Sequence, residues 1–508
     1  MKRRQSHRPY TLGGGATDRF ATVDLVIGSF LGNLTGSMGS GAGPAAALTG
    51  RPPVADDGLA GYRAAVDDLR RRLAALPAEA PVRLVKPTSN LFRPRAGTGA
   101  GLDVSAFTRV LAVVPAERVA DVGGMTTYED LVDATLPYGL MPAVVPQLKT
   151  ITLGGAVTGL GIESTSWRWG MPHETVRELD VLTAGGDVVT ASREGEHAAL
   201  FRCFPNSYGS LGYALRLRID LVPVRPFVRL RHVPFTDAGE LAAAVGEVVA
   251  SGSYAGEAVD FCDGTWFAAG EMYLTLGRFT DTAPYTSDYT GQEIFYRSIP
   301  RREVDHLTVR DYLWRWDTDW FWCSRAFGAQ HPLLRRLWPR RYRRSDVYWR
   351  LVALENRWHV ARAVDRRRGR PERESVVQDV EVPLERLADF LTALHDETGI
   401  SPVWLCPIRL RDGARWPLYP MAPGRTYVNV GFWSTVPLAP GEPDGTHNRR
   451  IERTVTDLGG HKSLYSTSFY GRDEFWRLYN GDAYWPVKHA YDPHGRFADL
   501  YTKCVERA

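Results

Sequence analysis

The sequence predicts an α+β protein with more than one domain, and three observations support this prediction. The chain has 508 residues, which is more than one small hydrophobic core usually organises. Helix-like and strand-like segments are mixed along its first part, and residues 176–192 have the pattern of a β-hairpin. The character of the sequence changes near residue 226, and no repeat of solenoid length is present.

The first part begins with a predicted helix and continues with several strands. Residues 57–76 are amphipathic, because apolar side chains recur there at helical spacing. Thr126 or Thr127 is a suitable cap for a second helix, since acidic residues follow in its first turn. An Ala-Gly-Gly turn closes the hairpin at 176–192. Further elements are predicted as a strand and an Arg/Pro-rich loop at 82–95, two strands, a helix and a short strand at 109–145, and a strand at 211–224.

The second part carries longer strand-like runs and one unusual segment. Strands are predicted at 376–383, 402–410 and 426–433, with a helix at 384–396. Residues 295–350 are rich in arginine and aromatic residues. The predicted layout is a poorly ordered or peripheral tail (1–55), a first α+β domain (56–225), a second α+β domain with an antiparallel sheet (226–450) and a C-terminal segment that packs back on the first domain (451–508).

Composition excludes several classes of protein. The formal net charge is only +4, which does not indicate a nucleic-acid-binding protein. Five cysteines lie far apart, without CxxC or Cys/His spacing, so neither disulfides nor a metal site is predicted and a cytoplasmic location is the default. No apolar run reaches the length of a membrane span. The basic, Gly-rich N-terminus leaves a membrane-surface or targeting element and a signal peptide open as alternatives to a tail.

Residues 146–170, PQLKTITLGGAVTGLGIESTSWRWG, concentrate glycines around the single acid Glu163. The spacing is wrong for a dinucleotide fingerprint, and no GK[ST] follows for a P-loop. Two interpretations remain. One is a plain Gly-rich turn between strands. The other is a loop whose backbone amides line a long ligand, because glycine allows close approach of the backbone.

A resemblance to a known family favours the second interpretation, a loop that lines a long ligand. Pro146, Thr152, Gly154 and Gly155, followed by Trp169-Gly170, resemble the FAD-binding segment of PCMH-type (vanillyl-alcohol-oxidase superfamily) flavoproteins. The stretches VLTAGGDVV (181–189) and PNSYGSLG (205–212) are similar to later parts of that domain. The stretch GLGIESTSWRWG is similar to the Δ24-sterol reductase branch. Three further stretches agree with this branch and extend the match to the C-terminus: VVQDVEVPLERL (376–387), PVWLCPIRL (402–410) and EFWRLYNGDAYWPVKHAYDP (474–493).

The resemblance implies a two-subdomain FAD-binding domain with a substrate-binding cap, and non-covalent FAD. The glycine version of the pyrophosphate loop is missing, and Thr88, Ser89 and Asn90 stand in its place. His173 is the nearest residue for covalent attachment, which is not expected. The implied cofactor-binding residues are Pro146, Gln147, Leu148, Lys149, Thr150, Thr152, Gly154, Gly155, Gly159, Gly161, Ile162, Glu163, Ser164, Thr165, Gly170, Gly209 and Gly212.

The resemblance also implies reduction of an isolated C=C bond in a lipid, with NADPH as electron donor. Such a reduction needs a proton donor, and Glu163 is the first candidate, because an apolar site keeps a carboxyl protonated. The alternative is that Glu163 holds the flavin or closes a loop. Lys488 and His489 are further catalytic candidates, and Arg409 and Tyr427 are candidates for substrate contact. Cys406 is interpreted as a buried small hydrophobe.

Three functions follow from these observations. The first is an FAD-dependent reductase of a sterol side chain or a methylene-branched fatty acyl chain. The second is an alcohol or sugar-lactone oxidase or dehydrogenase on the same scaffold, and the third is a non-catalytic flavin- or lipid-binding protein. Segment 295–350 is compatible with a lipid entrance that contacts a membrane peripherally, with core aromatics beside solvated arginines, or with nucleic-acid stacking. A lipid small molecule is the expected partner, nucleic acid is not expected, and the oligomeric state is left open.

Overall fold

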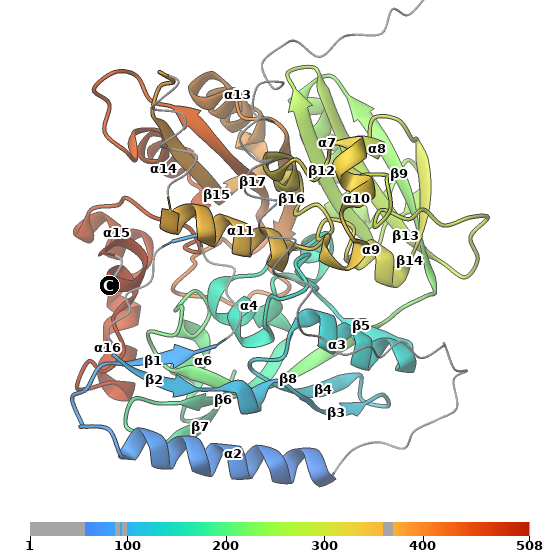
Figure 1. Cartoon of the computed structure of the whole chain (residues 1–508). Helices are drawn as coiled ribbons and strands as arrows, with labels where there is room; N and C mark the ends of the chain where they lie inside the picture. Colours follow the sequence, from blue (N-terminus) through green and yellow to red (C-terminus); the bar gives the residue numbers. More distant parts are fainter. Residues whose placement is uncertain (1–55, 87–91, 94–98, 359–368, 507–508) are drawn as a thin grey trace, which may run out of the picture.

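Two antiparallel sheets organise the computed structural model, which describes residues 56–86, 92–93, 99–358 and 369–506. In Figure 1 the six-stranded sheet occupies the lower half of the molecule and the eight-stranded sheet the upper half. This arrangement confirms the predicted α+β fold with an antiparallel sheet in the second part. The predicted tail 1–55 and the loop residues Thr88, Ser89 and Asn90 lie outside the described residues.

The six-stranded sheet is built from the first part of the chain. Its strand order is β3-β4-β8-β6-β7, with β5 paired to β8, and every pairing is antiparallel. The predicted hairpin at 176–192 is confirmed as β6–β7, and Gly186 in its turn has φ +95°. The strands are β3 (Val110–Val114), β4 (Val119–Gly123), β5 (Leu140–Pro142), β6 (Val176–Leu182), β7 (Val188–Ser192) and β8 (Tyr213–Pro223), with a separate parallel pair of β1 (Val82–Val85) and β2 (Ala100–Asp103).

Helices cover both faces of this sheet. The predicted amphipathic helix is α2, which lies below the sheet in Figure 1 and buries Leu69 and Leu73. Thr127, one of the two predicted caps, accepts a hydrogen bond from the amide of Asp130 at the start of α3. The helices are α2 (Asp56–Ala74), α3 (Tyr128–Thr135), α4 (Leu153–Gly159), α5 (Ser166–Trp169) and α6 (Ala198–Cys203), with 3₁₀ turns η2 (Ser105–Phe107), η3 (Leu136–Tyr138) and η4 (Pro172–Thr175).

The glycine-rich segment is not a continuous loop, because α4 and α5 form within it. Thr152 caps α4, since its hydroxyl accepts a hydrogen bond from the amide of Gly155 at 3.2 Å. A Cβ atom at Gly154 would lie 2.7 Å from the carbonyl oxygen of Gly124, so the backbone of α4 touches the end of β4 directly. Part of the glycine content therefore serves close packing of helix on sheet.

The eight-stranded sheet is built from the second part of the chain and one C-terminal strand. Its order is β14-β9-β13-β12-β16-β17-β15-β18, with antiparallel pairing throughout. The strands predicted at 376–383, 402–410 and 426–433 are confirmed as β15, β16 and β17. The strands are β9 (Phe227–Phe235), β12 (Phe261–Ala268), β13 (Glu271–Thr280), β14 (Val304–Thr308), β15 (Arg373–Pro383), β16 (Val403–Arg409), β17 (Thr426–Pro437) and β18 (His461–Lys462), beside a small hairpin of β10 (Ser253–Tyr254) and β11 (Glu257–Ala258).

The two faces of the eight-stranded sheet have different environments. Alternate residues of a strand point to opposite faces. Val403 and Leu405 of β16 pack in the outer core under α7 (Ala238–Ser251), α13 (Leu387–Thr398) and α14 (Thr446–Asp457). Trp404 and Cys406, which alternate with these two residues along β16, belong to a second core that continues into the six-stranded sheet. The inner face therefore contacts the first part of the chain.

Segment 295–350 is largely packed into the protein. Trp316, Trp320 and Phe321 are buried, and the guanidinium of Arg335 pairs with Asp319 at 2.6 Å. The interpretation as core aromatics is therefore confirmed for these residues, but the expectation of solvated arginines is wrong for Arg315 and Arg335, which are buried. The helices here are α8 (Phe295–Ser298), α9 (Val309–Leu313), α10 (Pro332–Leu337) and α11 (Ser345–Trp358), with 3₁₀ turns η5 (Cys323–Phe327) and η6 (Arg340–Tyr342).

The C-terminal segment contacts both sheets. β18 extends the eight-stranded sheet beyond β15, whereas the amide of Val82 in β1 donates to the carbonyl of Arg496 at 2.9 Å. Helix α14 crosses the predicted boundary at 450/451, so the domain limits remain a prediction. Among the described residues, no helix is both long and apolar enough to cross a membrane. The remaining helical elements are η7 (Leu384–Arg386), α15 (Arg472–Leu478), α16 (Gly481–Tyr491) and the π-turn η8 (Thr502–Glu506).

We expect Gly154→Ala in α4 to destabilise the protein by about 1–3 kcal/mol, because the new methyl group overpacks against Gly124. The matched control is Gly61→Ala in α2, where no atom lies within 4 Å of the added Cβ. This control should stabilise the protein by about 0.5–1 kcal/mol through helix propensity. Unfolding midpoints of both variants test the difference, and a shift of the same sign in both would contradict it.

Candidate functional site

A cavity of about 450 Å³ lies between the two sheets, within the usual size range of ligand pockets. Its walls come from the β1 region, the segment around α4, the turn before β8, the inner face of the eight-stranded sheet and the C-terminal segment. Many residues predicted to bind the cofactor line it, namely Pro146, Gln147, Leu148, Thr150, Thr152, Gly154, Gly155, Gly159, Gly161, Ile162, Gly209 and Gly212.

Five predicted cofactor residues do not line the cavity, because each is engaged elsewhere. The ammonium of Lys149 pairs with Glu129 at 3.1 Å, and the hydroxyl of Thr165 donates to the carbonyl of Ala143 at 2.8 Å. Gly170 has φ +71° and its α-carbon faces the carboxyl of Glu174. Glu163 and Ser164 belong to the buried cluster described below, so direct contact of these five with a cofactor remains a prediction.

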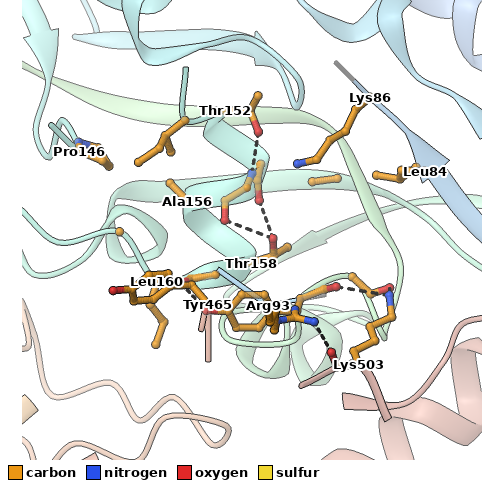
Figure 2. Close-up of a pocket in the computed structure, with 18 of the residues that line it drawn as sticks. Leu84, Lys86, Arg93, Pro146, Thr152, Ala156, Thr158, Leu160, Tyr465 and Lys503 are labelled. Carbon is orange, nitrogen blue, oxygen red and sulfur yellow. Dashed lines mark hydrogen bonds between the residues drawn. The ribbon is translucent and has the colours of Figure 1, made fainter. Parts of the chain in front are cut away.

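One wall of the cavity carries the groups suited to an anionic ligand. Figure 2 shows Lys86 extending towards α4, and its ammonium lies 4.0 Å from the position that a Cβ atom would take at Gly155. Gln147 lines the cavity, and its side-chain amide nitrogen Nε2 is buried without a hydrogen-bond partner among the described residues. A buried donor without a partner is costly, so this nitrogen fits a polar group of a bound cofactor.

A second region of the wall joins the C-terminal segment to the six-stranded sheet. The guanidinium of Arg93 lies 5.0 Å from the ring of Tyr208, and its Nε donates to the carbonyl of Leu464 at 3.1 Å. The ammonium of Lys503 donates to the carbonyl of Gly209 at 3.0 Å. Arg93 and Lys503 lie together in Figure 2, so these cations fix the C-terminal segment against the cavity.

A third region of the cavity wall is aromatic. Trp320 stacks on Phe92 with ring centroids 5.5 Å apart, and Phe321 lies 4.5 Å from Trp433. The indole nitrogen of Trp433 donates to the hydroxyl of Tyr465 at 2.9 Å. These side chains provide an aromatic, largely apolar surface next to the wall around α4.

Strained backbone gathers around the cavity. Leu160, Tyr208, Trp320 and Phe321 all line it, and their φ values are +58°, +49°, +46° and +59°. Bulky residues with positive φ are rare and cost about 1–3 kcal/mol each. Such conformations are typical of functional sites, where the surrounding structure holds side chains in a required place.

Glu163, the first candidate acid, lies behind the cavity wall in a buried ionic cluster. The hydroxyl of Ser164 donates to its Oε1 at 2.5 Å, and the guanidinium of Arg315 lies 3.5 Å from the same oxygen. Arg315 is closer to Asp263, at 2.9 Å. Burial and the charge of Asp263 raise the pKa of Glu163 to about 7, although Arg315 and Ser164 act in the opposite direction.

The other predicted catalytic and substrate residues are also outside the cavity wall. The buried ammonium of Lys488 donates to the carbonyl of Ser210 at 2.9 Å and to Asp492 at 2.6 Å, and burial lowers its pKa. His489 is exposed on α16, and Arg409 is half-buried at the end of β16. Tyr427 is buried, and its hydroxyl accepts a hydrogen bond from the amide of Ala422 at 3.2 Å. Their proposed roles remain predictions.

Two other sequence candidates are buried in the core. His173 packs edge-on against Trp416 at 4.5 Å, and burial lowers its pKa to about 3. It does not line the cavity. Cys406 is fully buried, and burial raises the pKa of its thiol well above the usual value, which agrees with a small hydrophobe.

Sequence reasoning missed most of the cavity residues outside segment 146–170. Lys86, Arg93 and Trp433 come from distant segments that only the tertiary fold brings together. Asp379 lines the cavity from within the stretch VVQDVEVP, where period-two alternation places Asp379 and Glu381 on one face of the strand. Two acids on one face of an otherwise valine-rich strand are the sequence signal that could have identified Asp379 as a cavity residue.

Comparison with known proteins agrees with this site. Residues 64–192 match the family model of an FAD-binding domain, so this chain carries an FAD-binding domain of the predicted PCMH type. The chain is similar to the Δ24-sterol reductase of Arabidopsis thaliana, with 27% identity over 374 residues, 62% of this chain and 61% of the plant protein. It is also similar to the Homo sapiens Δ24-sterol reductase (24% over 343 residues; 62% and 60%) and to a Caenorhabditis elegans homologue (25% over 325 residues; 60% and 58%).

These matches confirm the resemblance inferred from the sequence motifs and identify FAD as the cofactor. The chain spans about three-fifths of the length of the curated relatives it matches. The cavity residues of α4 lie within the matched residues 64–192. The aromatic residues Trp320, Phe321 and Trp433 lie outside the matched residues.

We expect Glu163→Gln to gain stability relative to the wild type as the pH rises from about 4.5 to about 7, and to keep that gain at higher pH. The folded pKa of Glu163 is raised, so its contribution to stability is complete below the unfolded value and is lost as the pH rises through about 7. Glutamine stays neutral, so this loss, at most about 1.4 kcal/mol per pH unit, is absent in the variant. Unfolding midpoints between pH 5 and 9 measure the effect.

Glu271→Gln, at the exposed start of β13, is the control for removing a carboxyl from the surface. A stability difference for Glu163→Gln that stays constant, or that falls with rising pH, would show that Glu163 is already ionised in the folded protein.

Proposed function

We propose that this protein is an FAD-dependent reductase of an isolated C=C bond in a lipid, with NADPH as the electron donor. The observation that carries the proposal is one continuous cavity with an FAD-domain wall at one end and an aromatic wall at the other. The relatives that the chain matches are named Δ24-sterol reductases, which supports the reaction class. A sterol side chain and a methylene-branched fatty acyl chain are both suitable substrates.

The residues of the first wall would hold FAD without a covalent bond. Lys86 offers a cation for the pyrophosphate, and Gln147 offers an unpaired amide nitrogen for a polar group of the cofactor. Gly155 and Gly161 lack side chains where the wall must approach a flat ligand closely. When bound, FAD supplies a carrier that accepts a hydride from NADPH and delivers it to the lipid.

The aromatic wall would bind the lipid and exclude water. Trp320, Phe321 and Trp433 bury an apolar chain without competing hydrogen bonds. An isolated alkene accepts a hydride only when a proton is delivered to the other carbon, so the chain must also place an acid here. Glu163 lies behind the wall, beside Arg315, and does not line the cavity. This position does not favour Glu163 as the direct acid.

The central test is anaerobic. We expect the purified yellow protein to bleach on addition of NADPH and to recover its colour on addition of an unsaturated lipid, with the saturated lipid as product. Absorbance of the flavin follows its reduction and reoxidation, and mass spectrometry of the lipid identifies the product. Bleaching by an alcohol or sugar lactone, but not by NADPH, would establish the oxidase alternative instead. Bound FAD that no donor bleaches would indicate a non-catalytic protein.

For peripheral membrane contact we propose the surface of α10. Leu333 and Leu337 are 68% and 77% exposed and lie one helical turn apart, and Arg336 between them is also exposed. Apolar side chains beside arginine favour an anionic lipid surface. A lipid substrate would enter from such a surface.

We expect Leu337→Glu to reduce sedimentation of the protein with vesicles of phosphatidylcholine and phosphatidylserine, because a carboxylate replaces an inserting side chain. Tyr138→Glu, which changes another exposed apolar residue in η3, is the matched control and should sediment like the wild type. Equal sedimentation of the two variants would argue against α10 as the contact.

A further inference from the structure

Asp379 is an acidic residue of the cavity wall. It lies on β15, on the strand face that points away from the outer core, and it lines the cavity. Its neighbours on that wall are Trp404, Trp433 and Tyr465. Among the lining residues that the structure describes, Asp379 is the only aspartate or glutamate.

The strand opposite Asp379 makes room for its carboxyl. Gly431 of β17 pairs directly with Asp379. A Cβ atom at Gly431 would collide with Oδ1 of Asp379 and would lie 3.0 Å from the indole of Trp433 and 3.4 Å from that of Trp404. The absence of a side chain at 431 therefore lets the carboxyl lie between two indole rings.

The surroundings of this carboxyl favour its neutral form. Oδ1 of Asp379 is buried and has no hydrogen-bond partner among the described residues. Burial raises the pKa of Asp379 to about 7, although Asn429 and Tyr465 act in the opposite direction. An apolar pocket that holds a neutral carboxyl is a recurrent arrangement for a general acid.

The ionisable groups around Asp379 do not supply a nearby positive charge that would ionise it. Glu381, on the same strand face, is buried, and burial together with the charge of Asp379 raises its pKa well above the usual value. Tyr465 and Tyr208 face the pair from the C-terminal segment and from the turn before β8, and burial raises the pKa of both. Arg93 lies 5.0 Å from the ring of Tyr208. Lys462 of β18, which pairs with Val380 next to Asp379, forms an ion pair with Glu452 at 2.5 Å.

We propose that Asp379 is the catalytic acid, and that it donates the proton to one carbon of the lipid double bond. The inference rests on the proposed function. It replaces Glu163 in that role, because Glu163 shares a guanidinium with Asp263 behind the wall, whereas Asp379 faces the cavity.

The step balances in atoms and charge. The π electrons of the alkene form a C–H bond with the proton of the Asp379 carboxyl, and a hydride from the reduced flavin forms the C–H bond at the other carbon. The alkene is thereby reduced by two electrons, the flavin is oxidised by two electrons, and Asp379 is left as a carboxylate. A proton from solvent restores the acid, and NADPH restores the reductant.

The test compares Asp379→Asn with the wild type in the two half-reactions of the FAD-loaded protein. We expect bleaching by NADPH to be unchanged and reoxidation by the unsaturated lipid to slow by about 10²–10⁴-fold, because general acids contribute factors of this size. In the wild type, reoxidation should fall as the pH rises through about 7, since only the neutral acid donates, and the residual rate of the variant should not follow this profile. Asp389→Asn, on the exposed face of α13, is the matched control.

A second measurement does not depend on turnover. The infrared difference spectrum of wild type minus Asp379→Asn, without substrate at pH 6, should contain the carbonyl band of a neutral carboxyl, and this band should be lost at pH 8. Absence of the band at pH 6 would overturn the proposal, as would reoxidation of Asp379→Asn at the wild-type rate. If the amide variant does not fold, Asp379→Ser removes the acid with a smaller side chain and is measured in the same way.

These results separate the inference from the proposed function. A wild-type protein that NADPH bleaches and an unsaturated lipid reoxidises, together with an equally fast Asp379→Asn, refutes only the role of Asp379. A wild-type protein that no unsaturated lipid reoxidises refutes the proposed function and, with it, the assigned role, whatever the infrared spectrum shows.

Discussion

The cavity depends on how one buried guanidinium joins the two sheets. Arg315 lies between Glu163, which follows α4, and Asp263 of β12, and its side chain is fully buried. The amide of Cys262 on β12 donates to the carbonyl of Ser164 at 2.7 Å beside this cluster. Removing one member of a buried ion cluster costs about 3–5 kcal/mol, so the contact holds the sheets in one relative position. That position determines how far the cavity wall around α4 lies from the aromatic residues Trp404 and Trp433 of the eight-stranded sheet.

With the sheets fixed, the two ends of the cavity acquire different chemistry. The wall around α4 offers Lys86 and an unpaired amide to an anionic, extended cofactor. The eight-stranded sheet contributes indole rings and the carboxyl of Asp379, whose pKa burial raises to about 7. Trp320 and Phe321 reach the cavity through consecutive residues of positive φ, a strain that the dense aromatic core around them sustains. Reduction of an alkene requires both chemistries within one water-poor space.

Glu163 and Asp379 illustrate how position divides similar carboxyls between roles. Burial raises the pKa of both to about 7. Glu163 shares Arg315 with Asp263 and is not among the residues that line the cavity. Asp379 lies opposite a glycine and lines the cavity, and its buried Oδ1 has no hydrogen-bond partner among the described residues. Access, more than acidity, therefore distinguishes the structural carboxyl from the proposed acid.

The sequence by itself determined the local elements and the FAD-binding segment. Period-two alternation identified β15, β16 and β17, the Ala-Gly-Gly turn identified the β6–β7 hairpin, and the motif around Gly154 and Gly155 identified the cofactor wall. These signals are local, because each depends on side chains a few residues apart. Only the tertiary structure decided which carboxyl meets the cavity. Asp379, Gly431 and Tyr465 are brought together by sheet register and by the return of the C-terminal segment, and such long-range pairings leave no periodic pattern in the chain.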